Sequence, residues 1–311
     1  MEEEEQKPSN FRKFISFVLV IFVILLSLVY WFIPLNSIDF GIQSTSTNFS
    51  LNPEIQEEMQ FYSKLRYPEK EISYHIMEDC TLQKRADMEL AFEIIENKTI
   101  LDFYESNPGE ITVSCTSNNK VKGDFFIAGE GGPTNITKTS NFNVIFNGHI
   151  LLIKDSTCPQ PNVAIHELLH ALGIDHSENK NNIMYNYSKC YQTIGQDTLD
   201  LIDELYSVEP RVDLALENVS VVMNGNYLDT NITIKNHGLK KSELTTLKIY
   251  ADQKMVKEIE INPIEIGGGR MIVLTNNWIS KTNFENLKYE IFYFEDELSS
   301  NNNVLFFNKV E

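Results

Sequence analysis

The pattern of apolar and polar positions begins with one continuous apolar run. Phe14 to Ile33 is twenty residues without a charge and with only two serines. A helix rises roughly 1.5 Å per residue, so this length spans about 30 Å, the thickness of a bilayer's hydrocarbon core. Tyr30 and Trp31 stand near the end of the run, where aromatic side chains favour the membrane interface. The pattern therefore predicts a transmembrane helix over residues 14–33.

Basic residues are distributed unevenly around this run. Lys7, Arg12 and Lys13 precede it, whereas the first basic residue after it is Lys64. Positive charge is retained on the cytoplasmic side of a membrane. The asymmetry therefore predicts a cytoplasmic tail over residues 1–13, a membrane partner for the helix, and an extracellular location for the rest of a single-pass membrane protein.

A cleaved signal peptide is the alternative interpretation of the apolar run. Such a peptide has a shorter apolar region followed by a cleavage site of small residues, and Pro34 to Ser37 match that site poorly. A retained signal anchor over 14–33 is the interpretation that we favour. Residues 34–70 then form a polar juxtamembrane stalk, with a short helix expected over 53–65.

A change of periodicity marks a globular domain over residues 71–208. Residues 72–77 alternate like a strand, and residues 81–97 place apolar side chains at helical spacing. Residues 100–105 and 111–116 again have the pattern of strands. The order strand, helix, strand, strand indicates a mixed α/β domain.

The second half of this domain carries a turn signal and a closing helix. Asn147-Gly148 separates two apolar segments, 142–146 and 149–153, and this dipeptide is a strong predictor of a β-hairpin. Residues 129–133 (GEGGP) are expected to form a surface loop. Residues 197–206 (DTLDLIDELY) have the spacing of an amphipathic helix.

The pattern changes again over residues 209–311. Short strand-like segments follow one another, separated by Gly, Asn and Asp: DLALENVSVVM, YLDTNITIKN, LTTLKIYAD, RMIVLTNNW, LKYEIFYFED and NVLFFN. Many short strands in about a hundred residues are typical of an all-β immunoglobulin-like sandwich.

Charge limits the classes of partner. The formal net charge is −18 at pH 7 and the sequence pI is about 4.8. Nucleic-acid binding requires a basic surface, so we expect no nucleic-acid partner. The acidic excess is interpreted as a solvated surface.

The segment with the clearest chemistry is VAIHELLHALGIDHSENKNNIM, residues 163–184. His166 and His170 are four residues apart and share one helix face, and Glu167 follows the first histidine. Gly173 permits the turn that ends the helix and brings His176 back. Three neutral imidazoles beside a carboxylate are typical of a catalytic zinc that keeps one position for water.

This arrangement of residues resembles the HExxHxxGxxH motif of the metzincins. A chance match is on the order of 1 in 100,000 for a chain of this length. Ser177 after the third histidine and Asn182 to Tyr185 downstream are most similar to the matrixin branch. The resemblance implies an α/β fold with a five-stranded mixed sheet, one Zn²⁺ held by His166, His170 and His176, and peptide or protein substrates.

The resemblance also implies roles for further residues. Glu167 would be the catalytic general base, Met184 the Met-turn floor beneath the metal, and Tyr185 part of the substrate pocket. Residues 142–146 would be the antiparallel edge strand that faces the cleft, with an ordinary hairpin as the alternative. A bound calcium cannot be read from the sequence, because its loops carry many unspecific acidic residues.

Four cysteines, Cys80, Cys115, Cys158 and Cys190, follow the apolar run. Their even number suggests two disulfides. A second zinc site is the alternative, although no CxxC pair exists. In a matrixin-like sheet, Cys80 and Cys115 would lie at the same end, and Cys158 and Cys190 would flank the metal site, which implies the pairs 80–115 and 158–190.

The C-terminal sandwich resembles the CARDB family, an adhesion-associated domain. The similarity lies in Asp213-Leu214-Ala215, in Ile234 to Gly238, and in Glu295-Asp296-Glu297 with Asn301 to Asn303. It implies a surface partner for this domain.

Two functions follow from these patterns. The first is a membrane-anchored zinc endopeptidase. The second is a catalytically inactive adhesion or scaffold protein that binds partners through its sandwich. No cysteine lies in residues 34–70, so the propeptide cysteine that matrixin zymogens usually use for latency is not matched. The natural substrate does not follow from the sequence.

Overall fold

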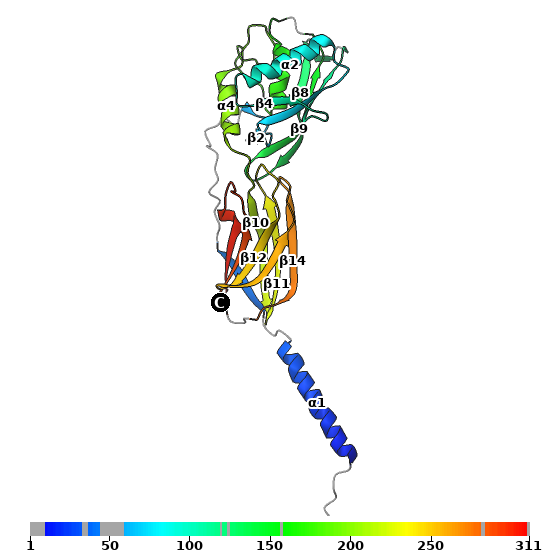
Figure 1. The fold of residues 1–311 in the computed structure, drawn as a ribbon, viewed down its shortest axis with the longest axis vertical. Helices are drawn as coiled ribbons and strands as arrows, with labels where there is room; N and C mark the ends of the chain where they lie inside the picture. The colour runs from blue at the N-terminus through cyan, green and yellow to red at the C-terminus, as the bar shows by residue number, and fades with distance from the viewer. Residues whose placement is uncertain are drawn as a thin grey trace, which may run out of the picture.

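A computed structural model gives the fold of the chain. It describes residues 10–32, 37–43, 59–118, 120–122, 125–155, 158–280 and 284–309. Two domains are stacked along the long axis of the molecule, and a separate helix stands beyond the second one (Figure 1). Residues 1–9 of the expected cytoplasmic tail, and 34–36 and 44–58 of the expected stalk, lie outside the described residues.

The N-terminal domain is built on a mixed sheet. Its strand order is β2-β9-β5-β3-β4, with β8 paired to β9. All of these neighbours are parallel except β8 and β9, which are antiparallel. The strands are β2 (Leu65–Arg66), β3 (Glu71–Ile76), β4 (Asp102–Glu105), β5 (Ile111–Cys115), β8 (Gly129–Lys138) and β9 (Asn143–Leu152). The sheet thus has six strands and not the expected five, because the two-residue β2 joins it beside β9.

Three helices pack with this sheet. They are α2 (Leu82–Glu96), α3 (Asn162–Ala171) and α4 (Gln196–Ser207). The Thr81 hydroxyl accepts a hydrogen bond from the amide of Lys84 and so caps α2. Met88, Phe92 and Ile95 recur at helical spacing on the buried face of α2. This face joins side chains of β3, β5 and β9 in one core.

The expected hairpin at Asn147-Gly148 is wrong. Both residues lie inside β9, and the real hairpin joins β8 to β9 through residues 139–142. Gly148 serves a different purpose, because a Cβ atom there would lie 2.5 Å from the Tyr67 hydroxyl. The glycine permits close packing and not a turn.

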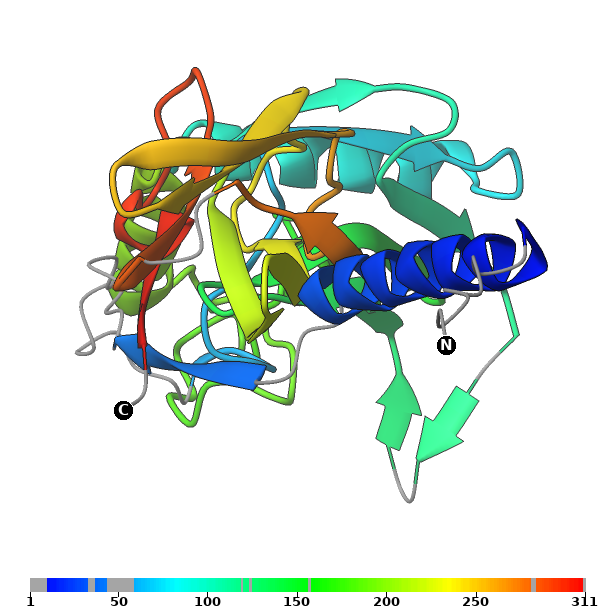
Figure 2. The ribbon, with the colours of Figure 1, turned by 90° about the horizontal axis from the view of Figure 1, so that it is seen from below.

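The interpretation of residues 129–133 as a loop is also wrong. These residues form the first half of β8, which is the antiparallel edge strand of the sheet. The edge strand assigned to 142–146 is instead the start of β9. A separate two-stranded ribbon, β6 (Lys120–Lys122) and β7 (Phe125–Ile127), projects from the domain (Figure 2).

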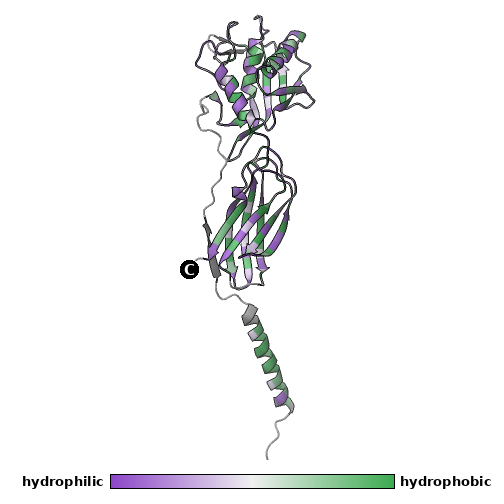
Figure 3. Cartoon of the chain, turned by 60° about the vertical axis from the view of Figure 1, so that its left-hand side comes forward, coloured by the Kyte–Doolittle hydropathy of each residue, from purple (hydrophilic) through white to green (hydrophobic). Residues whose placement is uncertain are grey.

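The C-terminal domain is all β, as expected. Its strands run in the order β13-β12-β15-β16-β1-β10-β11-β14, and apolar and polar positions alternate along many of them (Figure 3). They are β10 (Leu214–Asn224), β11 (Tyr227–Asn236), β12 (Thr245–Ala251), β13 (Lys254–Ile261), β14 (Gly269–Trp278), β15 (Asn286–Phe292) and β16 (Val304–Lys309). A short 3-10 helix, η2 (Asn301–Asn303), precedes β16.

One strand of this domain comes from the opposite end of the chain. β1 (Ser37–Gln43) pairs antiparallel with both β10 and β16. Residues 34–70 were expected to be a polar stalk, and this part of them is instead a strand that joins the two halves of the sandwich.

The tip of the β8–β9 hairpin contacts the C-terminal domain. The Thr139 hydroxyl donates to the backbone carbonyl of His237 over 3.1 Å, and the Ser140 amide donates to His237 Nδ1 over 3.2 Å. The Asn141 side-chain amide donates to the Asp213 carboxylate over 2.5 Å. Beneath these bonds, Phe142, Val144 and Leu239 form a shared apolar cluster. The two domains therefore share a small core of their own.

The apolar run forms helix α1 (Asn10–Phe32), which stands apart from both domains (Figure 1). Crossing a bilayer requires about 20 apolar residues in one helix. Among the residues that the structure describes, no helix combines sufficient length with sufficient apolar character. The predictions of a transmembrane helix over 14–33, of a membrane partner for it, and of a single-pass membrane protein are therefore wrong.

Candidate metal centre

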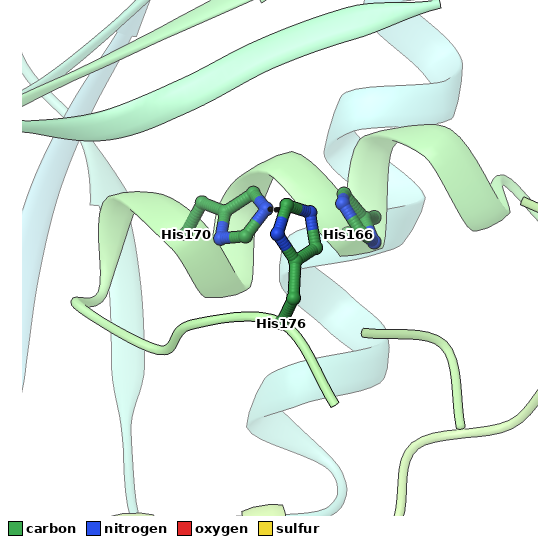
Figure 4. Close-up of side chains that lie close together, drawn as sticks. All are labelled: His166, His170 and His176. Carbon is green, nitrogen blue, oxygen red and sulfur yellow. Dashed lines mark hydrogen bonds between the residues drawn. The ribbon is translucent and has the colours of Figure 1, made fainter. Parts of the chain in front are cut away.

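Helix α3 and the turn after it position three histidines. His166 and His170 lie one helical turn apart on α3, and both are buried. Gly173 has a φ of 92°, and its amide donates to the carbonyl of His170 over 2.9 Å, which ends the helix. The chain then reverses, and His176 faces the other two rings (Figure 4).

The three imidazoles converge on one point. One ring nitrogen from each of His166, His170 and His176 lies within 4.8 Å of the others. The Nε2 atoms of His170 and His176 are 3.2 Å apart. In a tetrahedral site with metal–nitrogen distances of about 2.0–2.1 Å, ligand nitrogens are separated by about 3.3–3.4 Å. The spacing of His170 and His176 therefore fits two ligands of one zinc ion.

Backbone carbonyls orient two of the rings. His166 Nδ1 lies 2.7 Å from the carbonyl oxygen of Ile183, and His170 Nδ1 lies 2.7 Å from that of Ile174. A carbonyl only accepts hydrogen bonds, so Nδ1 carries the proton in each ring. The lone pair is left on Nε2, the atom that faces the shared centre. This is the tautomer that metal-binding histidines require.

Burial keeps these rings neutral. It lowers the pKa of His166 to about 4, and a positive charge on His170 would lower it further. Burial likewise lowers the pKa of His170. The side chain of His176 remains 44% exposed. His166 and His170 are thus available as neutral metal ligands at neutral pH. The exposed ring of His176 lies on the side of the site that solvent reaches.

Glu167 lies beside the histidines and is buried. Burial raises the pKa of its carboxyl to about 8, and the nearby charge of Glu130 adds to this effect. Strand β8 approaches it closely, since a Cβ atom at Gly129 would lie 2.7 Å from Glu167 Cγ and one at Gly131 would lie 2.3 Å from the Glu167 carbonyl oxygen. Gly129 thus brings the edge strand against the Glu167 carboxylate, and Gly131 brings it against the Glu167 backbone.

The segment after His176 returns beneath the site. The Ser177 amide donates to the carbonyl of Met184 over 2.8 Å, and the Met184 amide donates to Asn182 Oδ1 over 2.9 Å. Met184 is fully buried, whereas Tyr185 is half-buried and its ring lies 5.9 Å from that of Tyr187. The predicted Met-turn residue therefore lies in a segment bonded directly to the histidine loop.

Both predicted disulfides form. Cys80 bonds to Cys115, and Cys158 bonds to Cys190. The second joins the residues before α3 to the loop after Met184. Gln192 is buried in that loop, and its side chain donates to the carbonyls of Lys180 and Tyr187. The loop next to the metal centre is thus held by covalent and polar contacts.

A further segment at the site was missed in the sequence. Gln60 forms an antiparallel bridge with Ile174, and the Asp175 amide donates to the carbonyl of Met59 over 2.9 Å. The ring of Phe61 stacks on His170 with 5.5 Å between centroids. These residues had been assigned to the stalk, and no periodicity in so short a segment indicates its pairing.

Comparisons with known proteins agree with these two domains. Residues 66–207 match the model of the Matrixin family, and residues 211–305 match that of CARDB. The chain therefore carries a matrixin domain followed by a CARDB domain.

Individual relatives are distant. Macrophage metalloelastase of Rattus norvegicus is 25% identical over 193 residues, which are 56% of this chain and 39% of that protein. The chain thus matches well under half the length of this curated relative. A solved CARDB domain from Pyrococcus furiosus, in complex with di-metal ions, is 16% identical and covers 32% of this chain and 90% of its own, with a TM-score of 0.25.

Proposed function

We propose that this protein is a zinc-dependent endopeptidase. The observation that supports the proposal most directly is the convergence of His166, His170 and His176, because the 3.2 Å spacing of two Nε2 atoms matches a tetrahedral site. The matrixin match over residues 66–207 agrees with a metalloprotease.

The three imidazoles would hold one Zn²⁺ through their Nε2 atoms. When bound, the ion would lower the pKa of a coordinated water and polarise the substrate carbonyl. The carbonyls of Ile183 and Ile174 fix the orientation of His166 and His170. Residues of the Met184 segment would form the apolar floor of the site, and Tyr185 would line the pocket for a substrate side chain.

Glu167 would serve as the general base. It would accept a proton from the attacking water and deliver it to the leaving amine. Burial raises the pKa of this carboxyl, and a higher pKa makes a carboxylate a stronger proton acceptor. Its place beside the histidines, and not among the converging nitrogens, suits this role.

Peptides or proteins are the proposed substrates. Among the described strands, β9 is the one that pairs with β8, which makes β8 an edge strand of the sheet. An extended peptide can add to such an edge as a further strand. Because Gly129 and Gly131 bring β8 against Glu167, a peptide bound there would place a main-chain carbonyl near the metal centre.

The test is the Glu167→Gln variant, measured for bound zinc and for hydrolysis of an unfolded protein substrate. We expect zinc to be retained and hydrolysis to fall by about two orders of magnitude or more. Glu178→Gln, an exposed position on the histidine loop, is the matched control and should be unaffected. Full activity in Glu167→Gln would reject the role, and zinc without any cleavage by the wild type would favour a binding protein.

A further inference from the structure

Strand β8 runs from the metal centre to the CARDB domain. At one end, a Cβ atom at Gly131 would lie 2.3 Å from the Glu167 carbonyl oxygen, and at the other, a Cβ atom at Gly267 would lie 2.3 Å from Thr137 Cγ2. At roughly 3.4 Å per residue, these two contacts are about 20 Å apart along the strand. One strand therefore touches both the candidate centre and a loop of the second domain.

The surface between these contacts is hollow. A cavity of about 400 Å³ lies beside β8 and is lined by Phe61, Tyr62, Gly132, Pro133 and Ile136. Phe61 also stacks on His170. The cavity thus begins next to the metal centre and follows β8 towards Thr137, the residue that meets the CARDB domain.

The CARDB domain is fixed in this position. The Thr139 hydroxyl and the Ser140 amide are bonded to His237, and Phe142 and Val144 pack against Leu239. In the same domain, the Asn236 side-chain amide donates to the carbonyls of Lys240 and Ile264, and the Ile264 amide donates to the Ser242 hydroxyl. Residues 264–268, here called the CARDB loop, are therefore held against the end of β8.

We infer that the CARDB loop forms the far end of the substrate cleft and contacts the part of a polypeptide substrate that lies N-terminal to the scissile bond. The inference rests on the proposed endopeptidase function. A peptide that pairs antiparallel with β8 runs opposite to it, so its N-terminal part lies beside Ile136 to Lys138. The ligand of the cleft is thus an extended polypeptide. The contact with the CARDB domain favours substrates with a long N-terminal flank.

An irregularity in β8 indicates which part of the substrate depends on the CARDB loop. The register with β9 shifts between Pro133 and Ile136, and Pro133 has no amide hydrogen to donate. Main-chain pairing with a substrate weakens at such a bulge. Residues of the substrate beyond this point are therefore held by the cavity and by the CARDB loop.

Substrate length tests the inference on the full chain. A series of peptides shares one cleavage site and is extended, one residue at a time, on its N-terminal or its C-terminal side. We expect kcat/KM to increase by about fivefold or more once the N-terminal flank exceeds about six residues, the distance from Gly131 to Thr137 at strand spacing. A C-terminal extension of the same length should bring no such increase. Equal gains on both sides, or none, would overturn the inference.

A variant that fills the cavity provides a second test of the inference. A Cβ atom at Gly132 meets no atom within 4 Å, and Gly132 lines the cavity, so Gly132→Phe is designed to place a ring there. The ratio of kcat/KM between long and short peptides should fall to near one. Gln253→Phe adds the same ring at an exposed turn between β12 and β13 and should keep the wild-type ratio. An unchanged ratio in Gly132→Phe would contradict the inference.

Cross-linking locates the contact directly. Full-length Glu167→Gln is mixed with a peptide that carries a photoreactive residue about seven positions N-terminal to the cleavage site, a distance of about 24 Å. Cross-links should map to the CARDB loop, residues 264–268, and moving the group to the C-terminal side should abolish them. Cross-links confined to residues 59–207 would overturn the inference. If the wild type cleaves no peptide at all, the proposed function itself fails, whereas cleavage without length dependence rejects only the CARDB contact.

Discussion

At the scale of single residues, the metal centre depends on backbone atoms as much as on its side chains. The carbonyls of Ile183 and Ile174 fix the tautomers of His166 and His170. The glycines of β8 fix the distance between the edge strand and Glu167. Neither contribution involves a reactive side chain, and both depend on the position of the backbone next to the metal centre.

Gly131→Ala tests the close approach of β8 to α3. The new Cβ atom would lie 2.3 Å from the carbonyl oxygen of Glu167, and backbone atoms cannot move aside as a flexible side chain can. We expect a loss of about 1–3 kcal/mol in the free energy of unfolding, together with reduced peptide hydrolysis. Chemical denaturation and a peptide assay measure the two effects.

The neighbouring residue provides the control for that variant. Gly132→Ala places its Cβ atom in open space, so it should leave the free energy of unfolding nearly unchanged. If the two variants behaved alike, the proposed packing of β8 on Glu167 would be incorrect.

At the scale of elements, the two disulfides have different neighbours. Cys80–Cys115 joins the segment before α2 to the end of β5, whereas Cys158–Cys190 joins the segment before α3 to the loop after Met184. The first therefore braces the sheet, and the second braces the region around the histidines.

Paired serine substitutions separate these effects. The sequence separations are 35 and 32 residues, so loss of either disulfide should lower the free energy of unfolding by about 3–4 kcal/mol. Only Cys158→Ser with Cys190→Ser should also weaken zinc binding, because the loop that carries Met184 is released. Zinc titration of both double variants checks this, and an equal loss of affinity would contradict it.

At the scale of the whole molecule, the domains are joined by a small shared core. Leu239 of the CARDB domain is buried against Phe142 and Val144 of the matrixin domain. Leu239→Ala should lower the stability by about 2–4 kcal/mol and make the two domains unfold in separate steps. Calorimetry reports the number of transitions, and Leu244→Ala, which removes an exposed leucine, should keep the wild-type profile.

The comparison between sequence and structure differs from element to element. Helical periodicity located α2 and α4 well, because each buries one face against a single core. The prediction of a hairpin at Asn147-Gly148 was wrong because a glycine in this dipeptide can permit either a turn or a close contact. Here Gly148 permits the close contact with Tyr67. The prediction of a loop at residues 129–133 was wrong because glycines are common both in loops and in an edge strand that packs closely against a helix.

The apolar run shows a different limit. Its composition predicted the helix α1, which the structure contains. The further step, to a helix that crosses a membrane, is contradicted among the described residues.

The sequence by itself determined the two domains and the histidine motif, because these depend on local spacing: four residues along one helix face, a glycine that ends the helix, and strands that alternate in polarity. Only the tertiary structure decided the partners that are distant in sequence. β1 completes a sandwich built mostly from residues beyond 212, Met59 to Phe61 pair beside His170, and β8 meets the CARDB loop. No local pattern specifies these contacts, because they form only when separate elements bury their surfaces against each other.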